Sequence, residues 1–235
     1  MTIKVGINGF GRIGKLLVRA AWDWPELEFV QINDPAGDAA THAHLLNFDS
    51  IHGRWQHEAG HAEGELRIGD KQIKLTQNKA IADTDWSGCD LVIESSGVNK
   101  TVKALEAYLD QGVKRVVVSA PVKEPEALNV VMGVNQHLFD PAQHKIVTAA
   151  SCTTNCLAPV VKIVHEKLGI KHGSITTIHD LTNTQSDPDH YRVSYRDCGN
   201  LSGTARQAQW SRGAGALGQC LADRLCIRSG ESHQR

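Results

Sequence analysis

Residues 3–34 of the chain read IKVGINGFGRIGKLLVRAAWDWPELEFVQIND, and this stretch decides the fold. The apolar run Ile3 to Ile7 predicts a strand, and Lys15 to Trp22 has helix-forming composition. Gly9, Gly11 and Gly14 lie between them with the spacing GxGxxG. Strand, glycine turn and helix in this order predict the first half of a dinucleotide-binding unit.

A second β-rich run, residues 29–33, ends in Asp34, twenty positions after Gly14. A carboxylate at this distance accepts hydrogen bonds from the adenosine ribose hydroxyls. Asp34 also repels a 2′-phosphate, so we expect NAD rather than NADP. The glycines permit the tight turn and the close approach of the backbone to a pyrophosphate. The alternative is a glycine-rich surface turn without a ligand.

Composition excludes several classes of protein. The chain has 235 residues, of which 41% are hydrophobic and 22% are charged, as in ordinary globular proteins. Neither a bilayer-spanning run nor a signal peptide is visible, so we expect a cytoplasmic protein without membrane partners. A formal net charge of −1 gives no support for nucleic-acid binding. The six cysteines form no CxxC pair and are expected to be thiols, and the twelve histidines show no metal-site spacing.

Further strands and helices alternate along the chain. Residues 35–55 are polar and mixed, 64–75 are β-like, and 82–88 form a turn-prone link. Strands are expected at 89–94, 115–118, 129–134 and 145–149, with a helix at 100–111. This alternation predicts an α/β fold with a doubly wound, Rossmann-type sheet. Ser119 follows one strand at its carboxyl end, where ligands bind such sheets, although an ordinary loop serine would look the same.

A second motif, SCTTNC at residues 151–156, follows a strand and precedes a helical run at 157–167. Cys152 would start that helix, whose dipole favours a thiolate nucleophile. His179 ends a β-like run at 174–178 and is a plausible base for this thiol. The competing interpretation makes Cys152 a small buried hydrophobe and His179 a surface imidazole.

The motifs INGFGRIG, ND, FDSIHG, SAP and SCTTNCLAP, which begin at residues 7, 33, 48, 119 and 151, resemble the phosphorylating glyceraldehyde-3-phosphate dehydrogenases. The likeness runs through Gln185, about four fifths of the chain. It implies that Cys152 attacks the aldehyde to form a thiohemiacetal, with His179 as base. Hydride then passes to NAD, and inorganic phosphate cleaves the thioester. The resemblance assigns cofactor contacts to Gly9, Gly11, Arg12, Ile13, Gly14, Asp34, Asn78 and Ser119, and substrate contacts to Ser151, Thr153 and Thr182. Asn78 stands where relatives often carry a basic residue on the adenine side.

After Gln185 the resemblance stops. If the first base of the Asp187 codon is skipped, the codons to Ser229 permit a string beginning IPTTTGSPTAIAEIF, which resembles the family's catalytic domain. We therefore expect that the gene is read out of frame near Ser186 and that a preceding segment is missing. In relatives that segment helps to build the neighbouring subunit's cofactor site, so its loss calls the family homotetramer into question.

The expected organisation is a Rossmann NAD-binding domain at 1–150, the start of an incomplete α+β catalytic domain at 151–185, and a disordered tail at 186–235. The main functional hypothesis is an NAD-dependent phosphorylating aldehyde dehydrogenase with impaired activity. Two alternatives are a catalytically inactive dinucleotide-binding fragment and an erythrose-4-phosphate dehydrogenase. The wording of residues 24–38 also resembles a branch associated with arsenate resistance, in which arsenate would replace phosphate.

Overall fold

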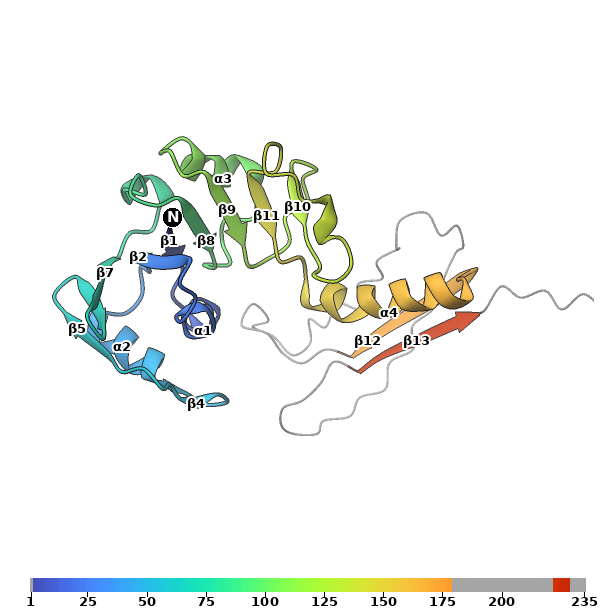
Figure 1. Cartoon of the computed structure of the whole chain (residues 1–235), viewed down its shortest axis with the longest axis horizontal. Helices are drawn as coiled ribbons and strands as arrows, with labels where there is room; N and C mark the ends of the chain where they lie inside the picture. The colour runs from blue at the N-terminus through green and yellow to red at the C-terminus, as the bar shows by residue number, and fades with distance from the viewer. Residues whose placement is uncertain (1, 179–221, 229–235) are drawn as a thin grey trace, which may run out of the picture. The chain divides into compact units, whose positions relative to one another are not determined.

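The computed structural model describes residues 2–178 and 222–228, the last segment and residues 176–178 as backbone alone. The chain forms two compact units (Figure 1). Unit 1 comprises Met1–Val131 with Asn135–Ser151, and unit 2 comprises Met132–Val134 with Cys152–Arg235.

Unit 1 contains a nine-stranded sheet in the order β10-β11-β9-β8-β1-β2-β7-β6-β5. Its strands are β1 (Ile3–Asn8), β2 (Leu27–Asn33), β5 (Ala59–Ala62), β6 (Glu65–Ile68), β7 (Lys71–Thr76), β8 (Leu91–Glu94), β9 (Arg115–Val118), β10 (Ala127–Asn129) and β11 (Ile146–Thr148). All pairs from β10 to β7 are parallel, whereas β5, β6 and β7 pair antiparallel. The chain runs from β1 to β2 on one side and later places β8 on the other side of β1. The carboxyl ends of β1 and β8 therefore mark the switch point where open α/β sheets bind ligands.

The helices of unit 1 are α1 (Arg12–Ala21), α2 (Ala39–Asn47) and α3 (Val102–Leu109), with 3-10 turns η1 (Ile81–Asp83) and η2 (Gln136–Leu138). Asp38 caps α2 by accepting a hydrogen bond from the N–H of Thr41 at 2.8 Å. Thr101 caps α3 in the same way through Ala104. A short hairpin, β3 (Phe48–Asp49) and β4 (Gly53–Arg54), follows α2.

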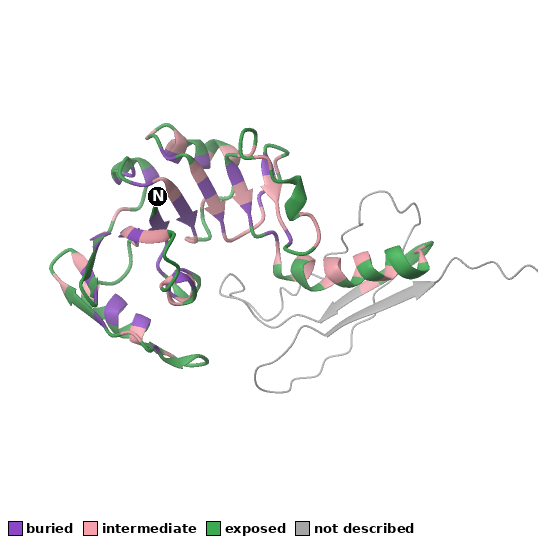
Figure 2. Ribbon diagram, in the orientation of Figure 1, coloured by how far each residue is buried: buried purple, intermediate pink, exposed green. Residues whose placement is uncertain are grey.

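Two hydrophobic clusters cover opposite faces of the sheet. Successive residues of β8 separate them, because Ile93 belongs to the cluster with α1 and α2 and Val92 to the cluster with α3. Figure 2 shows the buried residues concentrated on the strands between these layers. Full burial of each large aliphatic side chain contributes about 1.5–3 kcal/mol. Helices on both faces of a mainly parallel sheet confirm the predicted Rossmann-type fold.

Gly6 on β1 allows Cys89 and Trp86 to pack closely against this strand. A Cβ built there would lie 2.8 Å from Cys89 Sγ and 2.9 Å from the Trp86 ring. Trp86 is fully buried, so it has no room to move aside.

Two expectations for unit 1 need correction. The polar stretch after Asp34 contains α2, which was not expected. The expected strand at 129–134 is instead Ala127–Asn129, because the chain then turns through Gly133 at φ +83°.

Unit 2 contains α4 (Cys152–Leu168) and the antiparallel pair β12 (His172–Ile178) and β13 (Ala222–Arg228). Strand β13 lies within the stretch for which a disordered tail was expected. Its apolar run at 225–227 supplies a short segment that can complete a two-stranded ladder with β12. Within the described ranges, no helix is long and apolar enough to cross a bilayer.

Candidate functional site

The glycine turn after β1 is packed against the turn after β8. Gly9 has φ +90°, and a Cβ on it would lie 2.3 Å from the backbone nitrogen of Ser96. A Cβ on Gly14 would lie 2.4 Å from the Gly9 carbonyl oxygen. The fold itself therefore requires glycine at both positions.

Gly11 differs from the other two glycines. A Cβ there would meet nothing within 4 Å among the described residues, and the φ of Gly11 is −70°. Gly11 is the N-cap of α1, and no described side chain caps this helix. Because the first N–H groups of a helix lack intrahelical acceptors, the start of α1 offers donors to an anion in space that a Cβ would occupy. These features fit a dinucleotide pyrophosphate.

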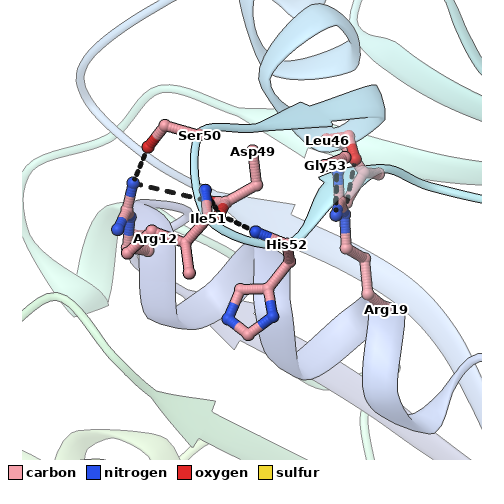
Figure 3. A network of polar contacts seen from close by, with 8 residues as sticks. All are labelled: Arg12, Arg19, Leu46, Asp49, Ser50, Ile51, His52 and Gly53. Carbon is pink, nitrogen blue, oxygen red and sulfur yellow. Dashed lines mark hydrogen bonds and ion pairs between the residues drawn. The ribbon is translucent and has the colours of Figure 1, made fainter. Parts of the chain in front are cut away.

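Arg12 and Ile13 are the first two residues of α1. The Arg12 guanidinium donates to Ser50 Oγ at 2.7 Å and lies 3.5 Å from the Asp49 carboxylate (Figure 3). Asp49 also accepts hydrogen bonds from the N–H groups of His52 and Ile51, which lower its pKa. The loop between β3 and β4 thus holds the Arg12 side chain beside the start of α1.

Asp34 follows β2 and lies beside the glycine turn. Its Oδ2 accepts from the Phe10 N–H at 2.6 Å, and Oδ1 accepts from the Ala36 N–H at 2.9 Å. A carboxylate has about four lone-pair positions, so these two bonds leave capacity for two hydroxyl donors. Asp34 is half-buried, which leaves part of the carboxylate accessible.

A buried polar network beneath the two turns was missed by the sequence analysis. The Glu94 carboxylate, 1% exposed, accepts from Asn8 Nδ2 at 3.0 Å and from the Tyr108 hydroxyl at 2.6 Å. It also accepts from the Ser96 N–H at 2.8 Å and Asn99 Nδ2 at 2.9 Å. Burial, and then the Glu94 charge, raise the pKa of Tyr108. The available sequence signal was a polar residue at the end of two buried strands, Asn8 and Glu94.

Two further predicted cofactor residues lie at the same sheet edge. The Ser119 N–H donates to the Glu94 carbonyl oxygen at 2.9 Å, which places Ser119 next to the end of β8. The Asn78 N–H donates to Asn33 Oδ1 at 2.9 Å. The Asn78 side chain donates to Thr84 Oγ1 at 2.9 Å, so the amide is held toward η1.

The thiol motif begins α4 in unit 2. Cys152 is the first residue of this helix and is exposed, while Ser151 and Thr153 beside it are half-buried. Ala150, just before the motif, has φ +56°, a left-handed conformation that costs a residue with a side chain about 1–3 kcal/mol. His179 and Thr182 lie outside the described residues, so the expected thiol and imidazole pair stays a prediction.

Cys89 gives a contrast to Cys152 within unit 1. It is buried, and burial raises the pKa of its thiol to about 11. No group of three or more histidine, cysteine or acidic residues that could hold a metal ion occurs in the part of the chain that the structure describes.

Two family models match the chain. The NAD binding domain of glyceraldehyde 3-phosphate dehydrogenase matches residues 3–102, and the C-terminal domain of the same enzyme matches residues 151–202. The second match continues beyond Gln185, the residue at which the motif resemblance ends.

Curated relatives agree with these matches. Glyceraldehyde-3-phosphate dehydrogenase 3 of Nostoc sp. is 58% identical over 189 residues, which cover 79% of this chain and 56% of the relative. The Geobacillus stearothermophilus enzyme is 44% identical over 187 residues, covering 79% and 55%. Glyceraldehyde-3-phosphate dehydrogenase 1 of Bacillus subtilis is 42% identical over 198 residues, covering 83% and 58%. The chain therefore spans somewhat more than half the length of these relatives.

Proposed function

The chain belongs to the glyceraldehyde-3-phosphate dehydrogenase family, and on this premise we propose that unit 1 binds NAD and that unit 2 carries the thiol for oxidation of a phosphorylated aldehyde. The observation that carries the proposal is the glycine turn. Gly9 and Gly14 hold its shape, Gly11 leaves space at the start of α1, and Asp34 lies beside it.

Each group of the turn has a proposed part in NAD binding. The N–H groups of Arg12 and Ile13 donate to the pyrophosphate at the positive end of α1. Asp34 accepts hydrogen bonds from the ribose hydroxyls. Asn78 is the proposed contact on the adenine side of the cofactor, and Ser119 is the proposed contact on the nicotinamide side. The Asp34 charge disfavours a 2′-phosphate, which supports NAD over NADP.

The proposed chemistry begins at Cys152. The Cys152 thiolate attacks the aldehyde carbon of glyceraldehyde 3-phosphate, and a proton reaches the carbonyl oxygen to give a thiohemiacetal. His179 is the proposed base, which takes the thiol proton of Cys152 before the attack and the hydroxyl proton of the thiohemiacetal as the hydride leaves. NAD, when bound, accepts the hydride, which leaves a thioester on Cys152. An oxygen of inorganic phosphate then attacks the thioester carbonyl, which releases an acyl phosphate and returns Cys152 to the thiolate. Ser151, Thr153 and Thr182 are the proposed contacts to substrate and phosphate. Erythrose 4-phosphate and arsenate remain alternative reactants to be tested in the same assay.

A second candidate function is dinucleotide binding without turnover. It is favoured by the loss of the motif resemblance after Gln185. Small errors in the placement of a catalytic pair cost large factors in rate, so an incomplete shell around Cys152 would leave binding but remove catalysis.

Two measurements on the whole chain separate these functions. Calorimetric titration with NAD tests the cofactor site, and NADH absorbance with glyceraldehyde 3-phosphate and phosphate tests turnover. Cys152→Ala is the matched control, because it removes the nucleophile from an exposed position while leaving unit 1 unchanged. Turnover that disappears in this variant supports the dehydrogenase. NAD binding without turnover supports the second candidate, and no binding refutes both.

We also propose that the reading frame changes near Ser186. The alternative-frame string begins at Asp187, whereas the family match runs to residue 202. Sequencing the coding DNA across the Gln185 codon decides between a change there, a later change and none.

The assembly and location are proposed in the same way. A cytoplasmic location follows from the composition, and cell fractionation tests it. The family homotetramer is not expected if the segment before the shifted string is missing, and sedimentation of the purified chain measures the assembly directly.

A further inference from the structure

A buried lysine lies directly beneath the glycine turn. Lys15, in the first turns of α1, is only 6% exposed. Its Nζ donates a hydrogen bond to the Phe10 carbonyl oxygen and lies 4.6 Å from the centre of the Phe10 ring. The same Nζ lies 3.0 Å from Nδ1 of His42 on α2. Lys15 therefore joins the turn to a second helix.

His42 has two ring nitrogens in different surroundings. The residue is 3% exposed, its ring makes an edge contact with Phe10, and Nδ1 faces the Lys15 ammonium. Nε2 is buried and has no hydrogen-bond partner among the described residues. Because Nδ1 must accept from an ammonium donor, the neutral ring carries its hydrogen on Nε2.

Nε2 points toward the loop that follows Asp34. A Cβ built on Gly37 would lie 3.3 Å from this nitrogen, and Gly37 has φ +89°. A side chain at residue 37 would crowd the imidazole, and the positive φ also favours glycine at this position.

The surroundings of Lys15 and His42 favour a single positive charge on the two side chains together. Burial, and then Lys15, lower the pKa of His42, while Asp34, the backbone of Ala36 and Asp38 oppose this shift. Burial lowers the pKa of Lys15 to about 8, against the attraction of Asp34. Strands β5 and β6, which pack on α2, bury only the apolar side chains Ala59, Leu66 and Ile68, and their His61 and Arg67 are exposed. On β3, Asp49 is engaged by Arg12 and its own loop.

The Phe10 peptide is held on both sides by this arrangement. Its N–H donates to Asp34 Oδ2 at 2.6 Å, and its carbonyl oxygen accepts from Lys15. Phe10 is the residue between Gly9 and Gly11, so this peptide sets the path of the backbone into α1. Asp34, which is also the proposed acceptor for the ribose hydroxyls, holds one side of this residue, and Lys15 holds the other side from beneath the turn.

We propose that His42 is a positioning residue of the dinucleotide turn, which as a neutral acceptor holds Lys15 on the Phe10 carbonyl and on protonation displaces Lys15 and loosens the turn. This proposal rests on the proposed function for its effect on NAD, but not for the coupling between His42 and Phe10. Protonation would place two positive charges 3.0 Å apart in a buried site, so one of them must move.

The sign of the pH effects follows from the lowered pKa of His42. Below about pH 6.5 the unfolded chain takes up a proton that the folded chain still excludes, so stability falls as the pH falls through this window. The turn itself loosens only at the lower pH where folded His42 becomes protonated. Loss of stability should therefore begin at a higher pH than loss of NAD binding.

The first test observes the coupling in the chain without NAD. Nuclear magnetic resonance follows the His42 ring and the Phe10 and Gly11 amides between about pH 8 and pH 5. We expect the two amides to shift with the midpoint of the His42 ring, and to lose this titration in His42→Asn. Amides that do not follow the ring overturn the proposal, whether or not NAD binds.

The second test measures NAD affinity by calorimetry against pH. His42→Asn keeps an acceptor near the Nδ1 position but cannot be protonated, whereas His42→Leu removes the acceptor. The NAD affinity of the wild-type chain should fall about tenfold or more on acidification, as expected for loss of one charge-assisted hydrogen bond. His42→Asn should keep its neutral-pH affinity throughout, and His42→Leu should be weak at every pH. His44→Asn, an exposed histidine on the same helix, should behave as wild type.

Outcomes of the two tests are separable. Acid weakening that persists in His42→Asn, or tight binding by His42→Leu near neutral pH, overturns the positioning role. If NAD binds at no pH while the amides still titrate with His42, the proposed function fails and the coupling stands.

Discussion

The glycine turn gives the sharpest prediction, because its glycines are required for different reasons. Gly14→Ala adds a Cβ 2.4 Å from the Gly9 carbonyl oxygen, an overlap between backbone atoms that no side-chain rotation relieves. Gly11→Ala adds the same Cβ where nothing in the described protein lies within 4 Å. The two variants therefore separate stability from binding.

The magnitudes follow from these contacts. In an ordinary helix, Gly→Ala stabilises by about 1 kcal/mol. Backbone overlap at residue 14 costs about 3 kcal/mol, the upper range for an overpacked site, so Gly14→Ala should lose about 2 kcal/mol net. For a domain of this size that lowers Tm by about 4–8 °C. Gly11→Ala should change stability by less than about 0.5 kcal/mol, because the poorer N-cap and the reduced entropy of the unfolded chain offset each other.

Binding should respond in the opposite order. The Cβ of Gly11→Ala occupies the approach to the first N–H groups of α1, so one or two phosphate hydrogen bonds are lost. We expect NAD affinity to fall about ten- to hundredfold. Urea unfolding followed by tryptophan fluorescence, to which buried Trp86 contributes, measures stability, and calorimetric titration measures binding. A Gly14→Ala variant as stable as wild type, or a Gly11→Ala variant that binds NAD normally, would contradict these assignments of the two glycines.

Three further predictions concern single side chains. The chain should bind NAD at least about tenfold more tightly than NADP, and Asp34→Ser should narrow this ratio in parallel titrations; an unchanged ratio removes Asp34 from the ribose site. Iodoacetamide at neutral pH should label exposed Cys152 well before Cys89, whose buried thiol has a pKa of about 11, and peptide mass spectrometry that finds Cys89 first contradicts this. Tyr108→Phe should destabilise by about 1.5–3 kcal/mol in urea, because the hydroxyl donates to the Glu94 carboxylate, and a loss below about 0.5 kcal/mol argues against that bond.

The fold of residues 3–34 was predictable because its signals are local. Strand, turn, helix and acid follow one another, and the structure places Asp34 beside Phe10 of the glycine turn. Helix α2 was not predictable in the same way. Its buried residues His42, Ala43 and Leu46 are few, and its packing depends on strands β5 and β6 further along the chain.

The site was predictable to the same extent. Gly9 and Gly14 are constrained within one motif, so the sequence pattern was sufficient for them. The Glu94 carboxylate meets Asn8, 86 residues earlier, and Lys15 meets His42, 27 residues later. No local sequence pattern predicts such contacts, because each partner alone looks like a polar residue at the end of a strand or on a helix.

The central position of β1 in the sheet has a consequence for synthesis of the chain. The hydrogen bond between Asn8 and Glu94 can form only after another 86 residues have been added. At about 5–20 residues per second this takes roughly 4–17 seconds of translation. During this interval one edge of the strand carries unpaired backbone groups on the ribosome. The last strand of unit 1 ends at Thr148, so its sheet needs no later residue to close. Strand β12, by contrast, pairs with β13 only after a further long stretch has been translated. A nascent chain that is arrested between these two strands would therefore fold only unit 1.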